Sequence, residues 1–137
     1  MSMSNDARQA SGRDPPRVVV VGPCASGKTT LVARLKRLGF DAKVSGQEHS
    51  DVRNLWRRLD PDVLIALDID LQTLRSRRTE DWPGTIYDAQ RERLREAFEG
   101  ADAVIDTAVL TEDEVVRTVL GILEQRAGRT RSRPDYS

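Results

Sequence analysis

A run of four valines stands directly before a glycine-rich segment near the start of the chain. Val18–Val21 is a short run of β-branched residues, which is typical of a strand buried on both faces of a sheet. The next segment, Gly22–Thr29, reads Gly-Pro-Cys-Ala-Ser-Gly-Lys-Thr. The segment Lys28–Leu38, at the end of this stretch, has leucines at helical spacing. It is followed by Gly39, and glycine is common just after the last residue of a helix. This order predicts a strand, a tight loop and a helix.

The segment Gly22–Thr29 fits the pattern G-x-x-x-x-G-K-[ST], in which each fixed position has a physical role. Gly22 and Gly27 permit backbone torsions that a Cβ would forbid. The loop N–H groups and the positive end of the following helix would then converge on a polyphosphate. Lys28 would place a cation against the β and γ oxygens, and the Thr29 hydroxyl would ligate Mg²⁺. The predicted nucleotide-binding residues are Gly22, Pro23, Cys24, Ala25, Ser26, Gly27, Lys28, Thr29 and Thr30.

The rest of the chain alternates between strand and helix patterns. Strands are expected at Phe40–Ser45, Val63–Leu67 and Ala101–Asp106, and helices at Glu48–Leu59, Leu71–Arg78, Ile86–Glu99 and from the Thr111–Glu114 capping box to about Arg126. Such alternation predicts an α/β fold, with a parallel sheet of about four or five strands and helices on both faces. One domain is expected over residues 17–126, between a disordered segment 1–16 and a disordered basic tail 127–137.

The charge balance argues against binding to nucleic acid or membranes through net charge, and the cysteine content bears on the compartment. The 22 Lys and Arg residues balance the 22 Asp and Glu residues, so no net field would steer the chain to nucleic acid or an anionic membrane. A minor alternative is contact between the arginines of Arg126–Arg133 and RNA or DNA phosphates. The single cysteine, Cys24, excludes an intramolecular disulfide, and together with the polar N-terminal segment it favours a cytoplasmic protein. Cys24 is interpreted as a small loop residue, the alternative being a redox role.

Two carboxylates are candidates for chemistry at the carboxyl edge of the predicted sheet. Asp68 ends an apolar strand, as in a Walker B motif, and would lie near Mg²⁺. Asp70 is a second candidate for this role. An aspartate that only ends the strand or caps the next helix is an equally good interpretation. Glu48, in Gln47–Ser50, could accept a proton from a substrate hydroxyl or hold an attacking water. His49 is interpreted as a surface histidine, and Gln47 or Ser50 could instead cap a helix.

Arginines precede the Trp82–Gly84 loop. Phosphoryl transfer needs mobile cations that close over the γ-phosphate, and Arg75, Arg77 or Arg78 could supply one. For each of them, a solvated helix face is an equally good interpretation.

The chain resembles the small P-loop kinases, namely the shikimate, gluconate and adenylate kinase group, over roughly Arg17–Gln125. The resemblance is carried by Gly22–Thr29, by Leu64–Asp68 followed by Leu74–Arg78, and by Val104–Thr107 followed by a capped last helix. It implies a three-layer P-loop NTPase fold that binds ATP and Mg²⁺. It also implies that Arg75, Arg77 or Arg78 belongs to a lid, and that Thr107–Leu110 borders the adenine. The chain is also similar to short bacterial P-loop ATP-binding proteins.

The resemblance has departures that bear on activity. The chain is shorter than those kinases, and it has no full substrate-binding insert and no arginine that clearly contacts an acceptor phosphate. Only Glu48 stands where the group keeps an acid facing the acceptor. The sequence therefore predicts a kinase-like protein in which Lys28, Glu48, Asp68, Arg77 and Arg78 are catalytic and Thr29 and Asp68 hold the metal. The alternative is a nucleotide-binding module or slow ATPase that acts through a protein partner; the absence of an N-K-x-D motif disfavours GTP.

Overall fold

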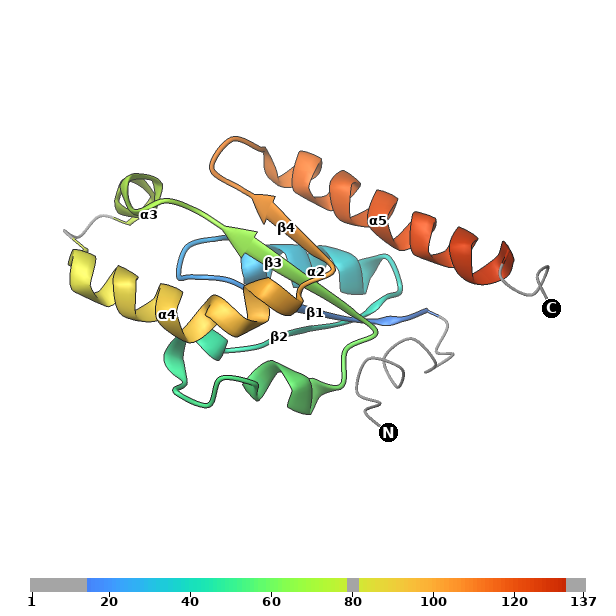
Figure 1. The fold of residues 1–137 in the computed structure, drawn as a ribbon. Helices are drawn as coiled ribbons and strands as arrows, with labels where there is room; N and C mark the ends of the chain where they lie inside the picture. The colour runs from blue at the N-terminus through green and yellow to red at the C-terminus, as the bar shows by residue number, and fades with distance from the viewer. Residues whose placement is uncertain (1–14, 79–81, 133–137) are drawn as a thin grey trace.

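The computed structural model describes residues 15–78 and 82–132. Four strands form one parallel sheet: β1 (Arg17–Val21), β2 (Asp41–Val44), β3 (Val63–Asp68) and β4 (Ala103–Asp106). Their order is β2-β1-β3-β4, and every neighbouring pair is parallel (Figure 1). The expected α/β architecture is confirmed, with β1 at the centre beside β3.

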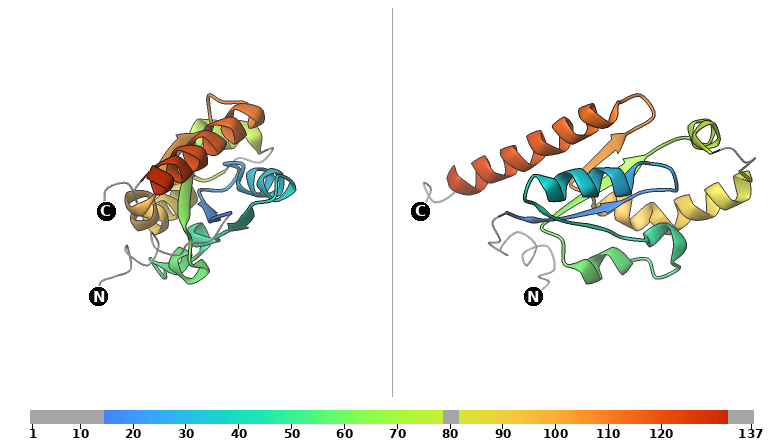
Figure 2. Two further views of the ribbon diagram at one scale, coloured as in Figure 1. Left: turned by 90° about the vertical axis from the view of Figure 1, so that its right-hand side faces the viewer. Right: turned by 180° about the vertical axis from the view of Figure 1, so that it is seen from behind.

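Alternate side chains of the central strands build two separate cores. On one face, Val18 and Val20 pack with residues of α2 (Lys28–Arg37) and α5 (Glu112–Ser132). On the other face, Val19 and Val21 pack with residues of η2 (Leu55–Leu59) and α4 (Gly84–Gly100). In Figure 1 α4 lies in front of the sheet, and the reverse view of Figure 2 brings α2 to the front. All four valines are fully buried, as the valine run predicted.

The helix expected over Glu48–Leu59 does not form. Two short 3₁₀ turns stand there instead, η1 (Gln47–His49) and η2, separated by an irregular segment. The fully buried Gln47 explains the difference, because its Nε2 donates to the Val52 carbonyl at 2.6 Å and its Oε1 accepts from the Trp56 N–H at 3.1 Å. These side-chain bonds compete with the backbone bonds that a continuous helix would need.

The short helix α3 (Leu71–Arg77) begins as the sequence predicted. Asp70 caps it, with Oδ1 accepting from the Thr73 N–H at 3.1 Å. The sequence predicts a loop over Thr79–Gly84; Trp82 and Pro83 precede α4, whereas Thr79–Asp81 lie outside the described residues. Ile69 and Asp70 alone separate β3 from α3, so α3 begins at the carboxyl edge of the sheet.

The Asp70 cap gives a prediction about pH. Hydrogen bonds from the side chain and backbone of Thr73 hold the pKa of Asp70 below its ordinary value of 3.8. A carboxyl whose pKa is lowered by folding contributes stability that is complete above the ordinary pKa and is lost as the pH falls through the folded pKa. An NMR titration should therefore give a folded pKa below the ordinary value, and Asp70→Asn should remove this contribution to acid unfolding. A measured pKa at or above the ordinary value would contradict the cap.

The last helix has the predicted capping box but a different end. Glu114 donates its N–H to Thr111 Oγ1 at 3.1 Å, and Thr111 donates its N–H to Glu114 Oε1 at 2.8 Å. The helix does not stop near Arg126 and continues through Ser132, so the predicted tail is helical up to that residue. Residues 1–14 and 133–137 lie outside the described part of the chain, and disorder there stays a prediction. Within the described residues, no helix is long and apolar enough to span a membrane.

Candidate nucleotide-binding site

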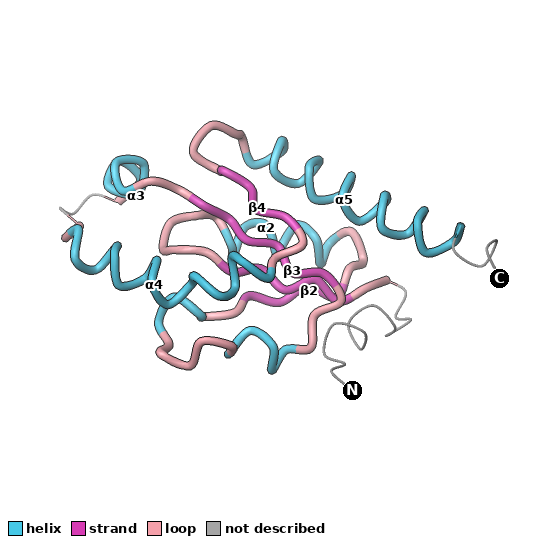
Figure 3. Tube along the Cα trace, in the orientation of Figure 1, coloured by secondary structure: helices cyan, strands magenta, loops and turns pink. Residues whose placement is uncertain are grey.

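The loops that follow β1, β3 and β4 leave the sheet at the same edge (Figure 3). The first of them is the glycine-rich loop that joins β1 to α2. It turns tightly, with the Ser26 N–H donating to the Pro23 carbonyl at 3.2 Å and with positive φ angles at Ala25 (63°) and Gly27 (98°). Only glycine adopts the second torsion readily, so Gly27 allows the loop to enter α2. The loop therefore has the strand–loop–helix setting in which backbone N–H groups bind phosphates.

Lys28, the first residue of α2, is buried beneath this loop. Its Nζ donates to the Gly22 carbonyl at 2.6 Å and to the Pro23 carbonyl at 3.0 Å. It also forms an ion pair with Glu48 at 2.9 Å, and the two residues are only 8% and 4% exposed. The pair joins the loop to η1, which follows the neighbouring strand β2. The structure thus brings together two residues that sequence analysis selected independently.

Glu48 carries a free hydrogen-bonding position at this site. Its Oε2 contacts Lys28, whereas Oε1 is buried and has no hydrogen-bond partner among the described residues. An unpaired buried oxygen of this kind is unfavourable unless a ligand or a cation reaches it. Glu48 is therefore a group that a bound molecule would complete.

A cavity of about 400 Å³ opens beside the Lys28–Glu48 pair. Arg78, one of the predicted lid arginines, contributes to its wall, and the Arg78 guanidinium lies 5.4 Å from the centre of the Trp82 ring. The other lining residues are Cys24, Ala25, Gly27, Lys28, Thr29, Thr30, Val44, Glu48 and His49. Basic, acidic and hydroxyl side chains therefore face one space, which suits a small polar molecule. Thr29 is exposed there, and its role as a metal ligand stays a prediction.

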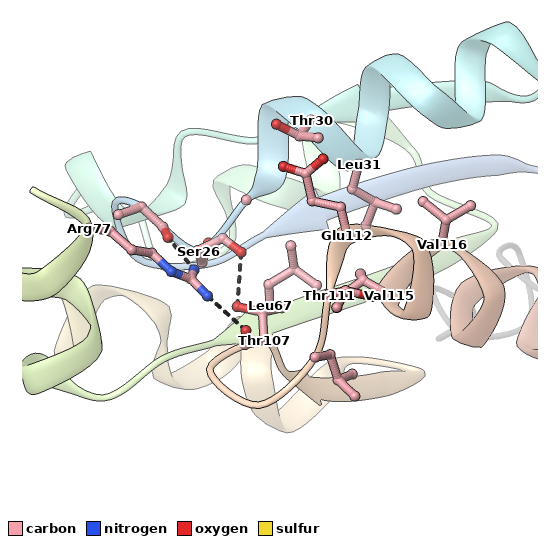
Figure 4. Close-up of a pocket in the computed structure, with 13 residues that line it drawn as sticks. Ser26, Thr30, Leu31, Leu67, Arg77, Thr107, Thr111, Glu112, Val115 and Val116 are labelled. Atoms are coloured by element: carbon pink, nitrogen blue, oxygen red, sulfur yellow. Dashed lines mark hydrogen bonds between the residues drawn. The ribbon is translucent and has the colours of Figure 1, made fainter.

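A second cavity, of about 470 Å³, lies on the other side of the loop, between α2 and the start of α5 (Figure 4). Its walls include Thr107 and Leu110, which the kinase resemblance placed beside the adenine. Thr107 is 4% exposed, and its hydroxyl donates to the Ser26 carbonyl at 3.0 Å. The loop after β4 is thereby held against the glycine-rich loop, and both form the wall of one pocket.

Arg77 contacts these same two loops by hydrogen bonds. Its guanidinium donates to the Ala25 carbonyl at 2.6 Å and to the Thr107 carbonyl at 2.7 Å (Figure 4). Arg75, by contrast, donates to the Trp82 carbonyl at 2.9 Å. Among the three predicted lid arginines, Arg77 thus contacts the loop backbone and Arg78 lines the cavity next to Lys28. Their catalytic roles stay predictions.

Asp68 ends β3 as expected, and its carboxylate contacts an arginine of α4 that the sequence did not indicate. Its Oδ1 accepts from Arg91 of α4 at 2.5 Å, and Arg91 also donates to the Tyr87 hydroxyl at 3.1 Å. Burial raises the pKa of Tyr87, whose hydroxyl donates to the Ile69 carbonyl at 2.6 Å. Asp68 lines neither of the two cavities around the loop. Arg91 contacts one oxygen of this carboxylate, and a metal-binding role for Asp68 stays a prediction.

Gln90 of α4 belongs to this site although no motif in the sequence indicated it. This residue is 2% exposed, and its Oε1 accepts from the Cys24 N–H at 3.0 Å while its Nε2 donates to Cys24 Sγ at 3.2 Å. Gln90 could have been found from its helical spacing, because it lies on the same face of α4 as the buried residues Tyr87, Leu94 and Ala97. A polar side chain on such a face is expected to have a specific partner. Gln90 holds the glycine-rich loop at Cys24, which is a variable position of the G-x-x-x-x-G-K-[ST] pattern.

Comparisons with known proteins bear on this site. No protein-family model matches the chain. It is 40% identical over 58 residues to a tRNA dimethylallyltransferase of Methylobacterium radiotolerans, a match that covers 40% of this chain and 19% of that protein. It is 30% identical over 91 residues to the ATP-dependent protease ATPase subunit HslU of Cereibacter sphaeroides, covering 65% and 21% respectively. The chain thus spans about a fifth of the length of these relatives. Together with the parallel sheet and loop, the matches show a three-layer α/β P-loop NTPase fold and support nucleotide binding.

Proposed function

We propose that this protein binds Mg·ATP and transfers the γ-phosphate to a small molecule. The observation that carries the proposal is the buried Lys28–Glu48 pair at the wall of the 400 Å³ cavity. A cation for the phosphate and a carboxylate for the acceptor are the two groups that phosphoryl transfer to a hydroxyl requires at one place. Here they lie 2.9 Å apart and face the same space.

The proposal assigns roles to the residues around the loop. The loop N–H groups and Lys28 hold the β- and γ-phosphates and stabilise the charge that develops during transfer. Thr29 would be the first ligand for Mg²⁺, and Asp68, whose Oδ1 contacts Arg91, would be the second. Arg78, from the wall of the cavity, neutralises the transferring group. The 470 Å³ cavity, with Thr107 and Leu110 in its wall, holds the base of the nucleotide.

Glu48 orients or deprotonates the acceptor in this mechanism. If Lys28 Nζ exchanged Glu48 for a bound phosphate, the carboxylate would leave its ion pair and become available to an acceptor hydroxyl. General-base catalysis of this kind contributes roughly 100- to 10,000-fold to a rate. Glu48→Gln should therefore lower acceptor-dependent turnover by at least about 100-fold, and ATP should still bind because Lys28 is retained.

The test measures ADP release by the purified protein with Mg·ATP and a broad panel of hydroxyl and phosphate acceptors. Glu99→Gln, an exposed change of the same type on α4, is the matched control and should leave turnover unchanged. If no acceptor raises ADP release above the basal rate while calorimetry shows ATP binding, the kinase proposal fails. That result would favour the alternative class, a nucleotide-binding module or slow ATPase that acts through a protein partner.

A further inference from the structure

Three side chains of the kinds that bind metal ions converge beside the glycine-rich loop. The Nε2 of His49 lies 4.0 Å from Cys24 Sγ and 3.5 Å from Glu48 Oε2. One ligand atom from each of the three residues lies within 4.8 Å of the others. Cys24 and His49 are the one cysteine and the one histidine of the whole chain. The fold therefore places its only thiol and its only imidazole next to a buried carboxylate.

A second observation points to a cation at this place. Glu48 is 4% exposed, and its Oε1 is buried without a hydrogen-bond partner in the described part of the chain. The same residue lines the 400 Å³ cavity with both Cys24 and His49. A carboxylate oxygen removed from water without a partner is energetically unfavourable. A metal ion in the cavity would give this oxygen the partner that the protein itself does not supply.

We propose that Cys24, Glu48 and His49 form a binding site for Zn²⁺. Ligand atoms at the usual zinc distances of about 2.0–2.3 Å in a tetrahedral arrangement are separated from one another by roughly 3.3–3.8 Å. The separations of 3.5 and 4.0 Å are close to these values, and all three ligand atoms lie within 4.8 Å of one another, so side-chain movements alone would assemble the site. The free oxygen Oε1 of Glu48 would then bind the ion while Oε2 keeps its ion pair with Lys28. A thiolate and an imidazole favour zinc over Mg²⁺, which prefers oxygen ligands and retains its water.

The surroundings of the three residues suit such a site. Gln90 donates one hydrogen bond to the Cys24 sulfur and accepts one from the Cys24 backbone N–H, and these two bonds orient the thiol. The His49 side chain is 64% exposed, which gives the ion a path from solvent. Three protein ligands leave a fourth position for water, and the proton of the Cys24 thiol passes to the solvent on binding.

This inference goes beyond the proposed phosphoryl transfer, because zinc binding needs neither a nucleotide nor an acceptor. The test uses the full chain, free of metal and of any affinity tag, under reducing conditions. Co²⁺ is the spectroscopic probe, because cobalt bound to a thiolate has a charge-transfer absorption in the near ultraviolet. We expect one Co²⁺ per chain with this absorption, and displacement of Co²⁺ by one equivalent of Zn²⁺. A large excess of Mg²⁺ should leave the absorption unchanged.

Two substitutions and one control decide the result. Cys24→Ser should abolish the charge-transfer absorption, and His49→Gln should weaken Zn²⁺ binding at least roughly tenfold in competition with a chromogenic chelator. Asp51→Asn, which changes a nearby carboxylate whose side chain is 89% exposed, should leave the affinity unchanged. Circular dichroism should be used to check that each variant is folded. Because the His49 side chain is mostly exposed, His49→Gln should not prevent folding. The proposal is overturned if no thiolate absorption develops, or if His49→Gln binds Zn²⁺ as tightly as the unmodified chain.

Discussion

Replacement of Lys28 by methionine is expected to lower the affinity for Mg·ATP by about 100-fold. Lys28 supplies the charged hydrogen-bond donor for the phosphates, and hydrogen bonds to charged groups contribute about 1.5–3 kcal/mol each. A loss of about 3 kcal/mol corresponds to roughly 100-fold in the dissociation constant. Isothermal titration calorimetry with ATP, in the presence and absence of Mg²⁺, measures the change. Lys36→Met, an exposed change on the same helix, is the control and should bind ATP normally.

The same substitution should also destabilise the protein, for a separate reason. Without Lys28, the carboxylate of Glu48 would remain buried and uncompensated, which costs about 3–5 kcal/mol when one partner of a buried ion pair is removed. The double variant Lys28→Met/Glu48→Gln should recover most of this stability in a urea unfolding experiment but should not recover ATP binding. If the single variant binds ATP within about threefold of the unmodified protein, Lys28 does not contact the phosphates and the loop assignment is wrong.

A methyl group at Gly22 is expected to distort the loop at its first residue. A Cβ there would lie 2.6 Å from the Leu67 carbonyl oxygen and 2.7 Å from Ser26 Oγ, both too close for real contacts. Overpacking of a tight interior typically costs about 1–3 kcal/mol, and part of the strain would move the loop N–H groups away from the phosphates. Gly22→Ala should therefore lower the free energy of unfolding by about this amount and weaken ATP binding at least roughly tenfold.

The control for Gly22 is another glycine with space around it. A Cβ at Gly121 of α5 would meet no atom within 4 Å, and Gly121→Ala replaces a helical glycine by a better helix former. This variant should be more stable by about 0.5–1 kcal/mol and should bind ATP normally. A Gly22→Ala protein as stable as the unmodified chain would mean that the loop and β3 are not packed as closely as the structure shows.

Local pattern was sufficient to predict most of the elements. The four valines, the glycine–lysine–threonine loop and the Thr111–Glu114 capping box each depend on residues that are close together in the sequence, and each was found in the structure. The apolar run Val63–Leu67 likewise became β3, paired with β1. Such features are predictable because backbone torsions, capping bonds and strand burial are decided within a few residues.

The differences arose from contacts between distant segments. The helix expected after Glu48 was prevented by one buried side chain, Gln47, whose bonds to the backbone could not be read from apolar spacing. Asp68 met Arg91 of α4, and Cys24 met Gln90 of the same helix, although each pair is separated by more than twenty residues. No periodic pattern encodes which helix face will meet which loop. The glycine-rich loop was therefore predictable from the sequence, and the partners that α4 provides were not.

The two hydrogen bonds of Arg77 make the position of α3 depend on both walls of the 470 Å³ cavity. Arg77 donates to Ala25 on one wall and to Thr107 on the other, so movement of α3 away from the sheet would break one hydrogen bond to each wall. Binding in the cavity and docking of α3 would be thermodynamically coupled if the bound molecule contacted both loops. A molecule that binds more tightly when both loops are held must, by reciprocity, hold α3 in place by the same free energy. Through Arg77, binding in the cavity would then stabilise the docked position of α3 at the surface of the protein.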